Sequence, residues 1–168
     1  NDHAGHGRSV EGDKNRGYFG KNDNSWKYLI NDMNYLEGMM RMEFPDIPYF
    51  MLGHSMGSFL AREYIAAYGN GFSGAVFMGS GYTNPMLPGG ILLSKYMSKK
   101  KPGEKGELLN RIAFGSFNRK IKDSETNFDW LSTDKDMVDK YINDDKCGFL
   151  FTNEGYRDLF LLIKDVNT

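Results

Sequence analysis

The order of hydrophobic and polar residues along the chain predicts helices alternating with strands. A helical pattern begins at Trp26 and stops before Pro45. Its predicted buried face consists of Trp26, Leu29, Ile30, Met33, Leu36, Met40 and Phe44. Two short apolar runs follow, at residues 49–52 and at residues 75–78 within the segment 73–80, and such runs are typical of strands covered on both faces of a parallel sheet. The segment between them repeats apolar residues at helical spacing before Gly69, at Leu60, Tyr64, Ile65 and Tyr68.

This succession of strand, helix and strand predicts an α/β fold. Two parallel strands joined by a helix form a right-handed crossover in nearly all cases. In such sheets the functional loops lie at the carboxyl ends of the strands. Ser55 falls at the end of the first predicted strand, so the sequence places it where a reactive residue is expected.

The sequence Gly53-His54-Ser55-Met56-Gly57 joins this strand to the following helix. A serine on a sharp turn between strand and helix has a strained backbone, and the residues two before and two after it are expected to be small because strand and helix nearly touch. Gly53 and Gly57 meet that condition. The bare Gly-x-Ser-x-Gly pattern is weak evidence, and its position between an apolar strand and an amphipathic helix is what predicts a nucleophile.

Composition limits the remaining possibilities. The 168 residues are 40% hydrophobic and 26% charged, which is ordinary for one globular domain. A net charge of −1 gives no reason to expect a nucleic-acid partner, and no apolar stretch approaches the length of a membrane span. The single cysteine, Cys147, fits a reducing compartment, so we expect a cytoplasmic protein. No metal or organic cofactor is implied.

Residues 82–150 differ in character from the segments before them. They contain short helical patterns interrupted by proline, glycine and a lysine run at residues 99–101, and they show no convincing strand. An apolar, helical insertion after a strand could be a lid over a hydrophobic cleft, or a helical subdomain with its own small core. Beside an apolar lid, the lysines could favour transient contact with an anionic membrane interface.

Several segments together resemble α/β-hydrolases of the serine aminopeptidase type, and among them bacterial lysophospholipases and monoacylglycerol lipases. The resemblance rests on the opening Asp-His-Ala-Gly-His-Gly-Arg-Ser at residues 2–9, the elbow at residues 53–57, Gly-Ser-Gly at 79–81, Phe-Asp-Trp-Leu-Ser at 128–132, and Asp-Asp-Lys-Cys-Gly-Phe at 144–149. It implies a partial α/β-hydrolase fold, with a core at 1–81, a helical lid at 82–150 and a return helix at 151–168.

The resemblance also implies a function. The protein would hydrolyse monoacylglycerol-like or lysophospholipid-like esters through an acyl-enzyme on Ser55, with the backbone amide of Met56 as one oxyanion donor. The lid would then line an acyl pocket with Leu87, Leu92, Tyr96 and Trp130. The partner would be a small lipid ester.

The base of such a triad is not evident in the sequence. In α/β-hydrolases the histidine follows the serine along the chain, whereas the three histidines here are His3, His6 and His54. The resemblance implies structural roles for His3 and His6, and His54 is expected to diverge from its neighbour Ser55. Acids such as Asp158 and Asp165 do not occupy the family's triad position. We therefore expect an internal fragment of a longer hydrolase, inactive by itself.

Two alternatives remain at this point. One is an α/β-hydrolase-like binding module without catalytic activity. The other is a peptidase or amidase related to the prolyl aminopeptidases.

Overall fold

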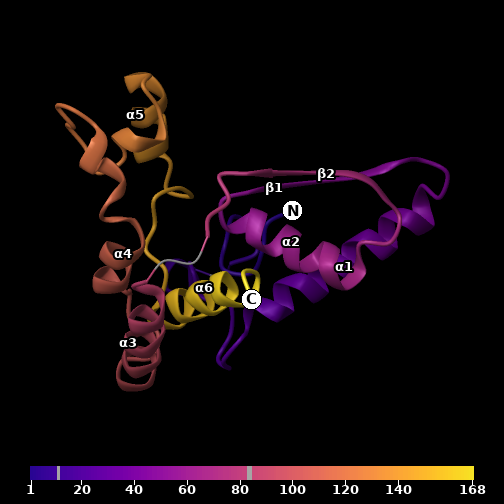
Figure 1. The fold of residues 1–168 in the computed structure, drawn as a ribbon, viewed down its shortest axis with the longest axis horizontal. Coiled ribbons are helices and arrows are strands. Elements are labelled where there is room, and N and C mark those ends of the chain that lie inside the picture. Colours follow the sequence, from indigo (N-terminus) through magenta and orange to yellow (C-terminus); the bar gives the residue numbers. More distant parts are fainter. Residues whose placement is uncertain (11, 83–84) are drawn as a thin grey trace. The chain divides into compact units, whose positions relative to one another are not determined.

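Figure 1 shows the fold as a computed structural model, which describes residues 1–10, 12–82 and 85–168. Residue 11, in the predicted core segment, and residues 83 and 84, in the predicted lid, lie outside the described residues. The 3₁₀ helices (η), α-helices and strands have the order η1 (Asp13–Asn15), α1 (Trp26–Glu43), β1 (Tyr49–His54), α2 (Met56–Tyr68), β2 (Phe72–Met78), α3 (Leu87–Lys100), α4 (Glu107–Phe114), η2 (Phe117–Lys120), η3 (Asp129–Leu131), α5 (Lys135–Asn143) and α6 (Asn153–Asp165).

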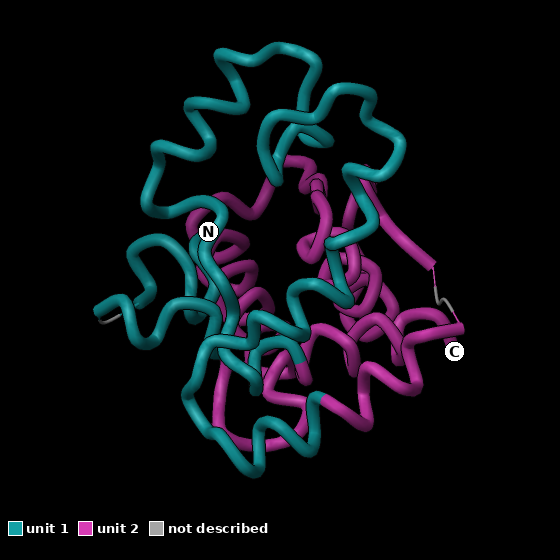
Figure 2. The backbone as a smooth tube through the Cα atoms, turned by 90° about the vertical axis from the view of Figure 1, so that its left-hand side faces the viewer, with its two compact units in different colours: residues 1–18, 94–156 teal, residues 19–93, 157–168 magenta. Residues whose placement is uncertain are grey.

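The described residues divide into two compact units, which Figure 2 shows in different colours. The first unit contains Asn1–Tyr18 and Ser94–Tyr156, and the second contains Phe19–Leu93 and Arg157–Thr168. The elbow and both strands belong to the second unit, and the opening glycine-rich loop belongs to the first. The predicted division into residues 1–81, 82–150 and 151–168 rests on expected roles and stays a prediction.

In the second unit, β1 and β2 pair in parallel, and α2 connects them. Leu52 lies opposite Val76, and His54 opposite Met78, so the two strands end side by side (Figure 1). The strand, helix and strand succession read from the sequence is thereby confirmed. Ser55 follows the last residue of β1 and stands at the carboxyl edge of the sheet.

Helix α2 packs against the strands and against α1 through both apolar and polar contacts. Tyr64 of α2 has no exposed surface, and its hydroxyl donates to Glu37 of α1 and lies 3.3 Å from the Asn34 side-chain oxygen. Burial and the Glu37 carboxylate raise the pKa of Tyr64, which keeps the hydroxyl a donor. Arg41 extends this polar stripe (Asn34, Glu37 and Arg41): it pairs with Glu37 at 2.5 Å and lies 4.3 Å from the ring centroid of Tyr49.

The predicted buried face of α1 is only partly right. Trp26, Leu29 and Ile30 are buried, but Leu36 and Phe44 are exposed. The cause is the polar stripe, because its side chains make the contacts with Tyr64 and with the carbonyl of Gly71. Leu36 therefore lies off the packed face, whereas Met33 and Met40 are half-buried, and Phe44 follows the end of the helix.

The sequence predicts strands of a parallel sheet that is covered on both faces, and in the second unit the described residues cover one face of this two-stranded part of the sheet. Phe50, Leu52 and Val76 are 69%, 67% and 52% exposed. The contacts of α1 and α2 explain the difference, since in Figure 1 both helices lie on the same side of the two strands. Among the described residues of the second unit, no helix covers the other side of this two-stranded sheet.

The first unit holds its opening loop against the segment that precedes α6. The carbonyl of Gly17 accepts a hydrogen bond from the Thr152 amide at 3.2 Å. The rings of Phe149 and Phe151 each lie 5.4 Å from that of His6, edge-on. This aromatic packing fixes the position of the loop within its unit.

The described residues between 85 and 150 form the helices α3, α4, η2, η3 and α5 and no named strand, as predicted. In this stretch Trp130 packs edge-on against Phe117, with ring centroids 4.7 Å apart. Asp129 accepts hydrogen bonds from the amides of Glu125 and Thr126, which ties the loop to η3. None of the helices in the described part of the chain combines the length and apolar character that crossing a bilayer requires.

A buried charged cluster anchors α6 in the second unit. The amide of Ser25, at the start of α1, donates to Asp158 at 2.8 Å. Arg157 lies 3.2 Å from Asp23 and 3.5 Å from Asp158. Asp158 has no exposed surface, and burial raises its pKa to about 6, although Arg157 and the Ser25 amide both favour the charged form.

This pKa shift predicts a pH-dependent stability. The folded-state pKa of about 6 lies above the ordinary 3.8, so the folded protein binds the Asp158 proton more tightly than the unfolded chain does. The resulting stabilisation is complete below about pH 4 and is lost as the pH rises through about 6. Relative to Asp158→Asn, the complete natural protein should therefore lose on the order of 2–3 kcal/mol of unfolding free energy between pH 4 and 7.

Urea denaturation of both proteins across this range measures the difference. Asp165→Asn is the control, because Asp165 is exposed on the same helix. A constant difference between wild type and Asp158→Asn at all pH values would contradict the prediction.

Candidate active site

Ser55 occupies a backbone conformation that side chains rarely adopt. It is the N-cap of α2 with φ 52° and ψ −122°, between the last residue of β1 and the first of α2. Such conformations cost about 1–3 kcal/mol and persist only where surrounding structure imposes them. The turn that the sequence predicted is therefore present, and Ser55 is at its apex.

Hydrogen bonds fix the backbone on both sides of Ser55. Its amide donates to the carbonyl of Met78, the last residue of β2, at 2.9 Å. Its carbonyl accepts from the amide of Ser58 at 2.8 Å and from the Ser58 hydroxyl at 2.6 Å. The turn is thus tied to the neighbouring strand and to the first turn of α2.

The hydroxyl of Ser55 is left available. Although Ser55 is an N-cap residue, its side chain makes no capping hydrogen bond, and the residue is exposed. Within its own unit, no described side chain is hydrogen-bonded to this hydroxyl. The amide of Met56 lies beside it at the first position of α2, where helix amides lack intrahelical partners and the helix dipole favours an anion.

Strand β1 and helix α2 come into close contact at only one of the two elbow glycines, Gly53. A methyl group at Gly53 would collide with the carbonyl oxygen of Gly57 and would lie 2.8 Å from the Cβ of Ala61. At Gly57, by contrast, the added methyl meets no described atom within 4 Å apart from its chain neighbours and the nearby backbone of its own helix. The expectation that both positions must be small is therefore corrected: the Cα–Cβ direction at Gly57 points into open space.

The structure shows which groups lie next to His54 and His6. The imidazole of His54 lies beside Gly79, where a Cβ would be 3.3 Å from the His54 Nε2. His6 in the first unit has its Nδ1 3.2 Å from the carbonyl of Ala4, and burial lowers its pKa. This is the hydrogen-bonded setting that the resemblance implies for His6.

The four residues proposed for an acyl pocket differ widely in exposure. Leu87 is buried, Trp130 is partly buried against Phe117, and Leu92 and Tyr96 are 73% and 61% exposed. Leu87 and Leu92 belong to the second unit, whereas Tyr96 and Trp130 belong to the first. Their common role in a pocket stays a prediction.

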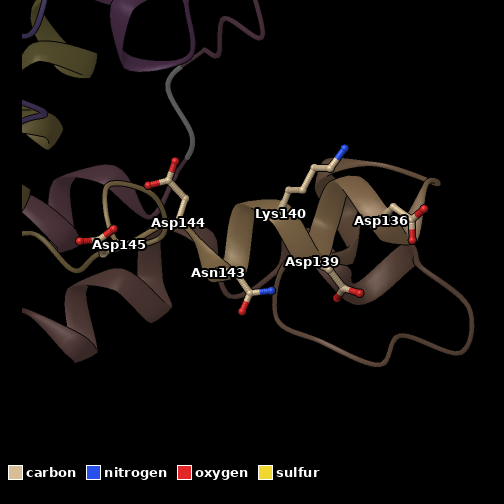
Figure 3. A pocket seen from close by; sticks show the side chains of 6 residues that line it. All are labelled: Asp136, Asp139, Lys140, Asn143, Asp144 and Asp145. Atoms are coloured by element: carbon tan, nitrogen blue, oxygen red, sulfur yellow. The ribbon is translucent and has the colours of Figure 1, made fainter.

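Two surface hollows in the first unit involve other residues. One, of about 590 Å³, is lined by Asp136, Asp139, Lys140, Asn143, Asp144 and Asp145. Figure 3 shows these carboxylates spread along α5 and the turn after it, without a common focus. In the part of the chain that the structure describes, no group of His, Cys, Asp and Glu side chains is arranged to hold a metal ion.

The second hollow lies at the opening loop, between His6 and Lys146.

Two groups of the elbow were missed in the sequence: Ser58 and the carbonyl of Met78. A serine in the first turn of a helix can donate a hydrogen bond to the carbonyl three residues earlier, so the role of Ser58 could have been predicted from the sequence. The contact of the Met78 carbonyl could not have been predicted in this way, because it depends on the register between β1 and β2.

A strained serine between a parallel strand and a helix is typical of the α/β-hydrolase class of fold. The chain matches the family model described as serine aminopeptidase, S33, over residues 1–168, and it belongs to this family. No curated protein gave a significant match to the sequence.

Solved structures agree on the fold. A highly thermostable carboxyl esterase from Bacillus coagulans, in complex with glycerol, is 28% identical with a TM-score of 0.85, and the match covers 98% of this chain and 54% of the esterase. A lipase in its open form is 22% identical with a TM-score of 0.81, covering 99% of this chain and 55% of the lipase. The chain thus spans about half the length of each, and the likeness to the lipase shows the fold alone.

The unequal crowding at the elbow glycines leads to a prediction. In the complete natural protein, Gly53→Ala should lower the unfolding free energy by about 1–3 kcal/mol, because the methyl group overpacks the strand–helix contact. Gly57→Ala should be neutral or stabilising by up to about 1 kcal/mol, because alanine favours the helix. Urea denaturation of both variants tests this, and equal destabilisation by the two substitutions would refute it.

Proposed function

We propose that this chain carries the nucleophile of a serine carboxylester hydrolase. The observation that carries the proposal is Ser55, held at φ 52° between β1 and α2 with a hydroxyl that makes no capping bond. Membership of the serine aminopeptidase, S33, family and the likeness to a carboxyl esterase at 28% identity support it.

In the proposed reaction the Ser55 hydroxyl oxygen attacks the ester carbonyl carbon as a base removes its proton. The carbonyl oxygen becomes an oxyanion, which accepts a hydrogen bond from the Met56 amide and a second donor. The carbon–oxygen bond to the alcohol then breaks, and the alcohol leaves with the proton. Water hydrolyses the acyl-Ser55 ester and releases the acid.

For the base we propose a histidine, paired with a carboxylate, that is not among the three histidines of these 168 residues. The settings of two of them support this view: His54 lies beside Gly79, and His6 packs edge-on against Phe149 and Phe151. The second oxyanion donor is likewise proposed to come from another segment.

For the substrate we propose a monoacylglycerol-like or lysophospholipid-like ester. The exposed surface of α3 supports an acyl ligand, because this helix buries the small residues Gly90, Ser94 and Ser98 and exposes Leu92 and Tyr96. Large apolar side chains directed to solvent are typical of a ligand or interface surface when they lie together.

We also propose that this surface makes transient contact with an anionic lipid interface. Lys95, Lys99 and Lys100 are exposed on the same helix as Leu92 and Tyr96. Lysines beside apolar side chains favour anionic interfaces through both charge and burial.

The proposed nucleophile can be tested by substitution of Ser55. In the complete natural protein, Ser55→Ala should lower kcat for p-nitrophenyl butyrate by about a million-fold, because the acyl-enzyme cannot form. A fluorophosphonate should label the wild type on the peptide that contains Ser55. Ser73→Ala, which changes an exposed serine on β2, is the control and should keep full activity.

Retention of a tenth of the activity in Ser55→Ala would reject the assignment. Turnover of aminoacyl p-nitroanilides in preference to esters would favour the peptidase alternative. A wild-type protein that is folded yet inactive and unlabelled would favour the binding module.

The proposed acyl-binding surface of α3, which exposes Leu92 and Tyr96, can be tested with esters of different chain length. Leu92→Ala should raise KM for p-nitrophenyl laurate about tenfold and leave KM for the acetate ester unchanged, because each lost methylene contact is worth about 0.8 kcal/mol. Met42→Ala is the matched control, since Met42 is also exposed but lies on α1. Equal changes in KM for the two esters would assign Leu92 no part in acyl binding.

A further inference from the structure

We propose that Ser58 is a positioning residue for ester hydrolysis: its hydroxyl holds the peptide between Ser55 and Met56 so that the Met56 amide faces the developing oxyanion. This inference rests on the proposed function of Ser55. It adds a residue whose side chain touches neither the substrate nor the Ser55 hydroxyl.

The geometry begins with one carbonyl group and two donors. Ser58 has no exposed surface, and its hydroxyl donates to the Ser55 carbonyl at 2.6 Å. The backbone amide of Ser58 donates to the same oxygen at 2.8 Å. Two donors occupy the two lone pairs of this carbonyl, so its direction is fixed more firmly than by a single helical hydrogen bond.

The direction of the Ser55 carbonyl determines that of the Met56 amide. The peptide unit is planar and trans, so its C=O and N–H point in opposite directions. A carbonyl held toward Ser58, inside α2, therefore directs the Met56 N–H away from the helix, toward the substrate side. Any rotation of this peptide would turn the oxyanion donor away.

The strain at Ser55 makes this restraint important. At φ 52° the turn would relax if the flanking peptides could rotate. The peptide before Ser55 is held by the Met78 carbonyl, which accepts from the Ser55 amide at 2.9 Å. On the other side the restraint comes from Ser58, so removing its hydroxyl loosens the peptide that carries the oxyanion donor.

The hydrogen bond by itself is ordinary, and the same chain shows this. In α3 the hydroxyl of Ser98, which is 7% exposed, donates to the carbonyl of Lys95 at 3.2 Å, again three residues earlier. Serines in helices often form such bonds. What distinguishes Ser58 is the carbonyl that it holds, and Ser98 therefore supplies a matched control.

The experiment compares Ser58→Ala, Ser58→Thr and Ser98→Ala in the complete natural protein, with p-nitrophenyl butyrate as substrate. We expect Ser58→Ala to lower kcat about 10- to 100-fold, less than the 10²- to 10³-fold that typically follows loss of an oxyanion donor. KM should change less than about threefold, because the donor acts mainly on the transition state. The affinity for an alkylboronic acid, which forms a tetrahedral adduct on serine, should fall in parallel with kcat.

The two other variants separate positioning from folding. Ser58→Thr keeps a hydroxyl that can reach the same carbonyl and should restore most of kcat. Ser98→Ala should keep kcat and boronate affinity within twofold. If Ser58→Ala does not fold, Ser58→Cys replaces it, since the thiol fills the space but is a weak donor, and the same loss of kcat is expected.

Three results would overturn the positioning role: a folded Ser58→Ala protein with kcat within twofold of wild type, a folded Ser58→Thr protein as slow as Ser58→Ala, or a loss of kcat without loss of boronate affinity. Failure of the proposed function looks different. In that case Ser55→Ala would remain active, or the wild type would show no ester turnover at all, whatever the Ser58 variants do.

Discussion

The structure depends most on the reversal of the chain at Ser55, where a strand becomes a helix within one residue. The reversal requires a positive φ at a side-chain-bearing residue and a contact between Gly53 and the first turn of α2 that leaves no space for a methyl group. The Met78 carbonyl and Ser58 hold the residue there from opposite sides. The pairing of β1 with β2 is therefore part of the site, because the register brings Met78 to the turn.

The strand–helix–strand unit and the elbow could be predicted because they depend on local sequence. Apolar runs, helical spacing and the position of Gly69 are all properties of neighbouring residues, and α2 ends where the sequence indicated. The burial of the strands could not be predicted in this way. An apolar run shows only that a strand can be covered, and Phe50 and Leu52 are exposed because both helices pack on one side.

The packing of α1 shows a second limit of sequence patterns. The apolar spacing correctly placed Trp26 and Leu29 inside, but it carried no information about Asn34 and Glu37. The hydroxyl of Tyr64 gives these two residues a role, since a buried phenol needs a polar partner and finds one on α1. Tertiary packing determines which polar residues accept a hydrogen bond from a buried donor. The periodicity of the sequence therefore cannot predict them.

Several buried polar groups of the second unit hold the fold, whereas the hydroxyl of the proposed nucleophile, Ser55, does not. Tyr64, Arg41, Asp158 and Ser58 are engaged with protein partners, and each of these contacts fixes a helix or a turn. The hydroxyl of Ser55 differs, because it is exposed and makes no capping bond although it stands at a helix N-terminus, where serine side chains commonly cap. The strained backbone accounts for this difference: at φ 52° Ser55 lacks the extended conformation from which a capping serine reaches the amides of the first turn. The same strain that costs stability at the turn thus keeps the hydroxyl of the proposed nucleophile out of a helix cap.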